Sequence, residues 1–106
     1  MEKFKEVSAL LEKLCSAKGV SGAENEAAKV ASELLEKYMP AKTDVLGSVT
    51  GTTGEGDTHI LLDAHLDQIG LVVTAIDEDG FLKVTKCGGA VAPQNPIKKK
   101  NLQKKQ

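Results

Sequence analysis

The residues best able to do chemistry in this chain lie in one short stretch, Asp63-Ala64-His65-Leu66-Asp67-Gln68-Ile69-Gly70. The neutral imidazole of a histidine such as His65 is a common metal ligand. A carboxylate two residues later, as at Asp67, can fix the tautomer of the ring and raise its basicity. The spacing alone is not specific, because a hydrogen-bonded structural histidine gives the same triplet more often than a metal ligand does. Both interpretations stay open at this point.

The residues just before this stretch predict the element that positions it. Residues 58–65 contain the compact apolar run Ile60-Leu61-Leu62, which is typical of a strand buried on both faces. Polar residues at the end of such a strand occupy the usual place of an active site in an α/β protein. A doubly buried strand needs covering layers on both sides. We therefore expect part of the covering structure to be missing from this chain.

Two amphipathic helices are predicted before the strands. Residues 3–17 carry apolar side chains at intervals of three and four, and Gly19 is suited to end this helix. Ser21 and Glu24 have the spacing of a capping box, so a second helix is predicted over residues 22–39, closed by the following proline. The apolar positions of the two helices are Phe4, Val7, Leu10, Leu11, Leu14, Ala27, Val30, Ala31, Leu34, Leu35 and Tyr38.

Short β-rich runs follow the helices. Residues 43–46 and 48–52 are interrupted by glycine and predict strands joined by turns. Residues 69–76 and 81–86 predict a hairpin around an acidic turn at residues 77–80. A solvated turn explains these acids better than a calcium loop, whose ligand spacing is absent. The fold class expected is α/β, with two N-terminal helices packed on a mixed β-sheet.

Length, composition and charge limit the functions that this chain can have. Its 106 residues, 41% hydrophobic and 27% charged, fit one small globular domain. All 14 basic residues are lysines, and without the five at positions 98–105 nine lysines face 15 acidic residues, which argues against a nucleic-acid-binding surface. The sequence shows no membrane-spanning run and no signal peptide, so we expect a cytoplasmic protein. Cys15 and Cys87 are expected to be free thiols.

A longer set of residues around His65 carries a family resemblance. Residues 61–73 and 76–82 form one block, preceded by residues 14–24, with a Gly-Val-Ser-Gly turn, and by Asp-Val-Leu-Gly at 44–47. In this order, these blocks resemble the glutamyl-aminopeptidase and cellulase-M-like metallopeptidases, also called tetrahedral aminopeptidases. The resemblance implies a partial zinc-peptidase-like catalytic domain. It also implies hydrolysis of N-terminal residues from peptide substrates by the full-length family members.

The same resemblance implies roles for two residues. In this family two divalent ions, zinc or cobalt, activate a water that attacks the peptide carbonyl. By match, His65 would bind one ion, and Asp67 would act in catalysis as the carboxylate that orients it. The general base and the remaining ligands lie in the family downstream of the matched residues. Gln68 stands where the family usually has a glutamate. We therefore expect this chain alone to be metal-free and without peptidase activity.

The C-terminal residues differ in composition from the rest of the chain. We expect residues 1–89 to be the truncated N-terminal part of the catalytic domain and residues 90–106 to be a disordered, lysine-rich tail outside the resemblance. A shifted reading frame after Gly88-Gly89 is one explanation, and a naturally short protein is the alternative. A second functional hypothesis is a non-catalytic interaction module that pairs through exposed sheet edges, including self-association.

Overall fold

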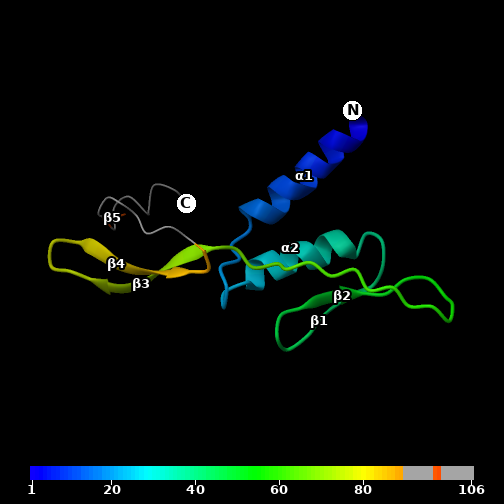
Figure 1. Ribbon diagram of the computed structural model, residues 1–106. Helices are drawn as coiled ribbons and strands as arrows, with labels where there is room; N and C mark the ends of the chain where they lie inside the picture. Colours follow the sequence, from blue (N-terminus) through cyan, green and yellow to red (C-terminus); the bar gives the residue numbers. More distant parts are fainter. Residues whose placement is uncertain (90–96, 99–106) are drawn as a thin grey trace. The chain divides into compact units, whose positions relative to one another are not determined.

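The computed structural model describes residues 1–89 and 97–98, which form helices and antiparallel strands (Figure 1). The chain divides into two compact units, Met1–Asp67 and Gln68–Gln106. The first contains both helices and a two-stranded sheet, and the second contains a three-stranded sheet. The expected α/β class is confirmed. No helix among the described residues is long and apolar enough to cross a membrane.

Helix α1, Glu2–Ser16, matches the first predicted helix closely. It contacts α2, Asn25–Leu35, but its apolar stripe is incompletely covered. Phe4 is 79% exposed, and Val7 and Leu11 are more than half exposed. The helix forms as the sequence pattern predicts, but its apolar side chains are less buried than the pattern implies.

Helix α2 is shorter than the sequence predicts. It begins at Asn25, after Glu24, and no side-chain hydrogen bond caps its N-terminus. Instead of completing a capping box, the Glu24 carboxylate accepts a hydrogen bond from the Gly22 backbone N–H at 2.6 Å. At the other end, the N–H groups of Tyr38 and Met39 both donate to the Leu35 carbonyl, so the last turn before Pro40 is not regular α-helix.

Strands β1, Ala41–Thr43, and β2, Val49–Gly51, form an antiparallel hairpin against which α2 packs. Asp44 organises its turn, because one of its carboxylate oxygens accepts hydrogen bonds from the N–H groups of Leu46 and Ser48, both at 2.9 Å. Gly47 has a φ of 87°, a conformation that side chains disfavour. Strands were predicted in this region, but both are shorter than expected.

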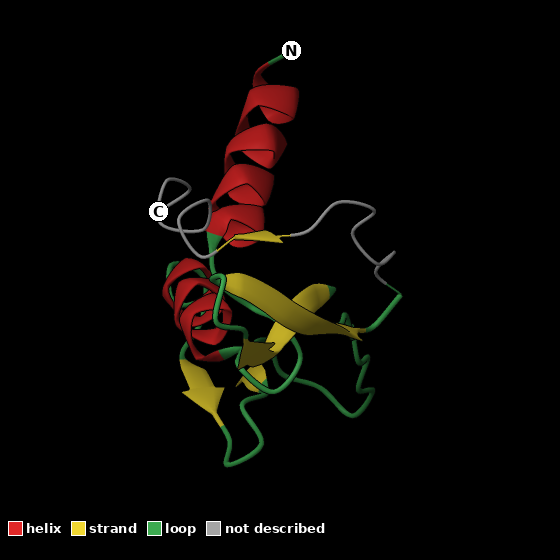
Figure 2. Cartoon of the chain, turned by 90° about the vertical axis from the view of Figure 1, so that its left-hand side faces the viewer, coloured by secondary structure: helices red, strands yellow, loops and turns green. Residues whose placement is uncertain are grey.

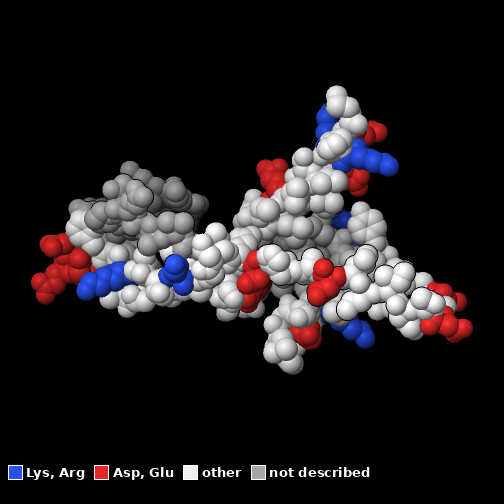
Figure 3. Space-filling model, viewed as in Figure 1, with Lys and Arg blue, Asp and Glu red and all other residues white. Residues whose placement is uncertain are grey.

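The predicted hairpin of the second unit is confirmed. Strand β3, Gly70–Ile76, pairs antiparallel with β4, Phe81–Cys87, with a register irregularity between Val73 and Ala75. In the turn, the Asp77 carboxylate accepts a hydrogen bond from the Phe81 N–H at 2.8 Å, and Gly80 has a φ of 82°. Acidic side chains gather at the hairpin tip (Figure 3), as expected for a solvated turn.

The strands form two separate antiparallel sheets in the described residues, instead of the one mixed sheet that we expected. The predicted strand over residues 58–65 is also wrong: residues 52–67 form a connection without helix or strand (Figure 2). Ile60, Leu61 and Leu62 are between 84% and 91% exposed. The physical reason is that a doubly buried strand needs neighbouring strands and covering layers, and none of the described elements pairs with this run.

The core is small. The buried hydrophobic residues among those described are Ala17, Ala27 and Ala28. Among the described residues, Val45, Leu46 and Ile60 are each more than 80% exposed. Much of the apolar surface of these residues is thus in contact with solvent. The expectation that covering structure is missing stays a prediction.

The predicted disordered tail falls mostly outside the described residues. Within it, Ile97–Lys98 form a short strand, β5, which pairs antiparallel with the start of β4. The remaining positions of the tail, 90–96 and 99–106, are not described by the structure. The boundary that we placed after residue 89 stays a prediction.

Candidate functional site

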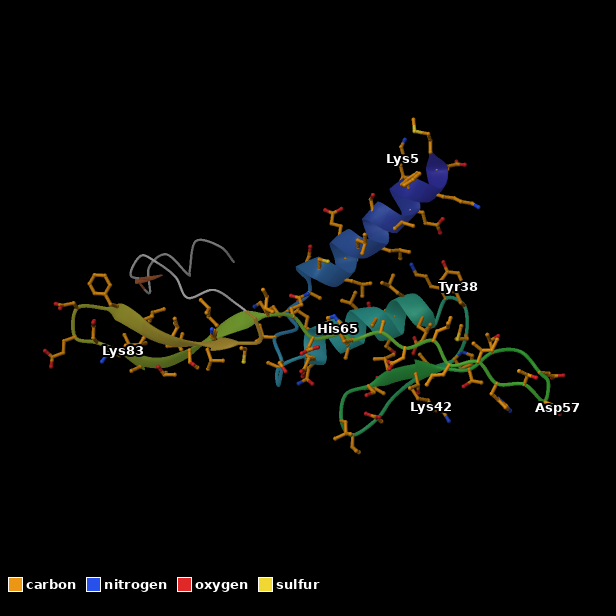
Figure 4. All side chains as sticks on the ribbon, in the orientation of Figure 1. Lys5, Tyr38, Lys42, Asp57, His65 and Lys83 are labelled. Atoms are coloured by element: carbon orange, nitrogen blue, oxygen red, sulfur yellow. The ribbon has the colours of Figure 1, made fainter. Side chains whose placement is uncertain are left out.

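The structure brings His65 and Asp67 together. The His65 Nδ1 atom lies 3.1 Å from the Asp67 backbone carbonyl oxygen and 3.2 Å from the Asp67 carboxylate oxygen Oδ1. The side chains are 88% and 46% exposed, respectively, and His65 is labelled in Figure 4. A proton on Nδ1 can therefore be donated to Asp67. With Nδ1 carrying the proton, the lone pair on Nε2 is the one that can bind a metal ion.

The pair is positioned by local backbone and not by a sheet. Both residues lie at the end of the connection that follows β2, in residues with neither helical nor strand geometry. The Asp67 carbonyl and carboxylate reach the same ring nitrogen because the two residues are only two positions apart. The sequence motif predicted this proximity. The roles of His65 as a metal ligand and Asp67 as its orienting carboxylate remain predictions.

A complete two-metal site does not fit the described residues. Within residues 1–89, no group of three or more His, Cys, Asp or Glu side chains is close enough to hold an ion together. A catalytic zinc takes about three protein ligands, and a two-metal site takes more. His59 and Asp63, which lie on the same connection and are exposed, do not complete a set with His65. The donor set amounts to one imidazole with its carboxylate.

The sequence did not predict one further feature, a hollow in the first unit. It has a volume of about 250 Å³ and is lined by residues of α1 and α2 and the turn after α2. It contains neither of the predicted site residues, and its charged groups are two lysines and one glutamate. Nothing in this lining resembles a nucleophile with its base or a metal cage. The lining residues are Lys13, Val30, Glu33, Leu34 and Lys37.

Comparison with protein families gives a specific match. The family model described as M42 glutamyl aminopeptidase matches residues 47–105. The matched range includes His65 and Asp67, and it begins within the turn between β1 and β2. It also runs through the lysine-rich end, which we expected to lie outside the family resemblance. That expectation was wrong.

Individual proteins agree with the family match. The chain is 40% identical over 81 residues to the Escherichia coli (strain K12) protein FrvX, whose name describes an aminopeptidase, covering 76% of this chain and 23% of that protein. It is 36% identical over 93 residues to a lysyl aminopeptidase of Pyrococcus furiosus, covering 86% of this chain and 27% of the relative. The chain thus spans about a quarter of the length of these relatives.

A solved structure shows the same fold. The crystal structure of a TET aminopeptidase from a marine sediment archaeon of the Thaumarchaeota matches with a TM-score of 0.71 and 32% sequence identity. The match covers 82% of this chain and 25% of that chain. The arrangement of helices and strands described above is therefore that of a corresponding quarter of a larger polypeptide.

Proposed function

Because this chain belongs to the M42 glutamyl aminopeptidase family, we propose that it supplies the N-terminal part of the catalytic domain of a metal-dependent aminopeptidase. In this proposal the substrates are peptides, and the reaction removes their N-terminal residues by hydrolysis. The proposal also includes a cytoplasmic location and the absence of nucleic-acid and membrane partners.

The observation that carries the proposal is the His65–Asp67 pair within the matched range. An imidazole whose Nδ1 faces a carboxylate and a carbonyl at 3.1–3.2 Å has the environment that metal-bound histidines usually have. His65 is proposed to bind one divalent ion, zinc or cobalt, through Nε2. Asp67 is proposed to hold the ring in the required tautomer and orientation.

The chain alone is proposed to be inactive and metal-free. The described residues provide too few ligands for two ions, as shown by the absence of any cluster of three donors among them. When bound, such ions supply a water that is acidic enough to attack a peptide carbonyl at neutral pH. The other ligands and the general base would have to come from side chains that residues 1–89 do not contribute.

A chimera tests the proposed roles directly. The segment of the Pyrococcus furiosus lysyl aminopeptidase that aligns with this chain would be replaced by the matching residues of this chain, including His65. We expect the chimera to hydrolyse an aminoacyl-nitroanilide in the presence of zinc or cobalt, and His65→Ala to abolish that hydrolysis. A folded chimera whose activity and metal content survive His65→Ala would refute the ligand assignment.

The isolated chain provides the second half of the test. We expect no hydrolysis of the same substrate by the 106-residue chain, and no stoichiometric metal after dialysis. Turnover by this chain, sensitive to chelation, would show that it carries a complete site and would contradict the proposed inactivity.

A second candidate function is a non-catalytic module that pairs through an exposed sheet edge. Strand β3 favours this candidate, because it lies at the end of the order β3-β4-β5 and pairs with β4 only among the described strands. It contains no charged residue and no proline, two of the features that protect an edge strand, and its protection is limited to the register irregularity between Val73 and Ala75. A second copy of the chain is the partner proposed for this edge.

A further inference from the structure

Three consecutive aliphatic residues lie exposed just before the His65–Asp67 pair. Ile60, Leu61 and Leu62, called the 60–62 segment below, are 84%, 87% and 91% exposed. Contiguous apolar surface of this kind on a soluble protein usually marks a binding site. The composition of the segment is that of a buried strand, yet no strand of either described sheet pairs with it. What the segment lacks is therefore neighbouring strands and a covering layer.

The comparisons indicate what those neighbours are. The fold of this chain matches a quarter of the TET aminopeptidase chain at a TM-score of 0.71. The match leaves three quarters of that polypeptide without a counterpart here, and the curated relatives leave a similar share. The 60–62 segment has the composition of a central strand. In a complete domain of this fold, the remainder of the domain is what would cover such a strand.

We infer that the 60–62 segment binds, in trans, the portion of an M42 aminopeptidase that has no counterpart in this chain. On binding, the segment adds as a strand to the sheet of that portion, with main-chain hydrogen bonds giving affinity and its aliphatic side chains becoming buried. The proposed partner is the complementary part of the catalytic domain, and not a second copy of this chain.

The consequence for the site follows from sequence proximity. His65 lies three residues after Leu62, so a strand that docks through the 60–62 segment carries the His65–Asp67 pair to the edge of the joined sheet. This part of the inference rests on the proposed function, because only a metallopeptidase partner would supply the remaining ligands. The binding itself rests on the exposed segment and on the shared fold.

Co-purification tests the binding. The full 106-residue chain would be co-expressed with a tagged Pyrococcus furiosus lysyl aminopeptidase from which the 93 aligned residues have been deleted. We expect the chain to be retained with the tagged protein. Leu61→Asp is expected to lower retention by about 10-fold or more, because it would place a carboxylate in an apolar interface.

Leu46→Asp is the matched control. Leu46 is 87% exposed, as Leu61 is, but it lies in the turn between β1 and β2. The control is expected to be retained like the unmodified chain. Equal loss with both variants, or equal retention of both, would overturn the inference, because the 60–62 segment would then have no specific part in binding.

A positive control shows whether the tagged partner, with its aligned residues deleted, is able to fold and bind. The deleted 93-residue piece of the relative, supplied as a separate chain, should be retained by the tagged protein. Retention of that piece without retention of this chain would overturn the inference. If the isolated chain instead forms a dimer that Leu61→Asp dissociates, and is not retained, the segment binds a second copy, and the inference is again wrong.

Hydrolysis separates this inference from the proposed function. Retention together with hydrolysis of an aminoacyl-nitroanilide, lost in His65→Ala, supports both. Retention without hydrolysis supports the docking of the 60–62 segment and counts against the proposed catalytic role. Failure of retention alongside an active chimera leaves the catalytic role standing and refutes the docking.

Discussion

Gly51 and Met39 lie in such close contact that a Cβ atom at position 51 would be 2.8 Å from both Cγ and Sδ of Met39. The same added atom would lie 3.0 Å from Cδ2 of Leu35, at the end of α2. Gly51 ends β2, so this approach is where the β1–β2 hairpin packs on the helix. The absence of a side chain at Gly51 is what permits this packing.

Gly51→Ala is therefore expected to destabilise the first unit by about 1 kcal/mol, at the low end for overpacking, because the flexible side chain of Met39 must move. The measurement is the free energy of unfolding from urea denaturation followed by circular dichroism. Gly89→Ala is the control: nothing lies within 4 Å of a Cβ at that position, so a change within about 0.5 kcal/mol is expected. An unchanged midpoint for Gly51→Ala would show that Met39 moves aside at no cost.

Asp44→Ala is expected to lower stability by about 1 kcal/mol, since two backbone N–H groups lose their acceptor in the β1–β2 turn. Asp44→Asn keeps one side-chain oxygen in the same place, so this variant should keep most of the stability that Asp44→Ala loses. Thermal unfolding of the three proteins in parallel makes the comparison. Equal destabilisation by both substitutions would mean that the negative charge matters, and not the acceptor geometry.

Asp67→Asn in the chimera described above is expected to weaken metal binding by about 10–100-fold, the usual effect of removing the carboxylate behind a metal-bound histidine. Metal affinity is measured by competition with a chromogenic chelator, which reads binding apart from hydrolysis. Asp57→Asn, on the same connection but away from the pair in Figure 4, serves as the control and should bind metal normally. Normal affinity in Asp67→Asn would remove Asp67 from the proposed site.

Val72→Lys is expected to reduce self-association through the β3 edge, because a charged lysine opposes edge-to-edge pairing. Val72 is 43% exposed and lies opposite Thr85 of β4, so the lysine can reach solvent. Sedimentation velocity over a range of protein concentrations measures the effect, with Thr53→Lys in the loop after β2 as the control. If the unmodified chain stays monomeric at high concentration, the result would count against the second candidate function, pairing through the β3 edge.

The parts of the fold that the sequence predicted well are those determined by neighbouring residues. The β3–β4 hairpin follows from β-branched runs around a turn whose Asp77 carboxylate and positive-φ Gly80 are both local features. Helix α1 likewise follows from the spacing of its apolar residues. For the same reason the contact between His65 and Asp67 was predictable, since two positions separate them.

The parts that were predicted wrongly depend on distant partners. The run around Leu61 was expected to be a buried strand, but strand geometry requires a neighbour to accept its hydrogen bonds, and the described residues provide none. The end of helix α2 is a local exception: the helix ends at Leu35 and not at Met39, because the Leu35 carbonyl accepts from two N–H groups in a tightened final turn. The rest of the metal site could not be predicted, because one imidazole does not specify its companions.

A core made of Ala17, Ala27 and Ala28 has a consequence for how the folding of this chain will look in solution. Unfolding a structure that already exposes most of its large aliphatic groups adds little newly hydrated area. The denaturant m-value and the heat-capacity increment both scale with that added area. The transition should consequently be broad and shallow for a polypeptide of this length, and it should steepen when a cognate partner is bound.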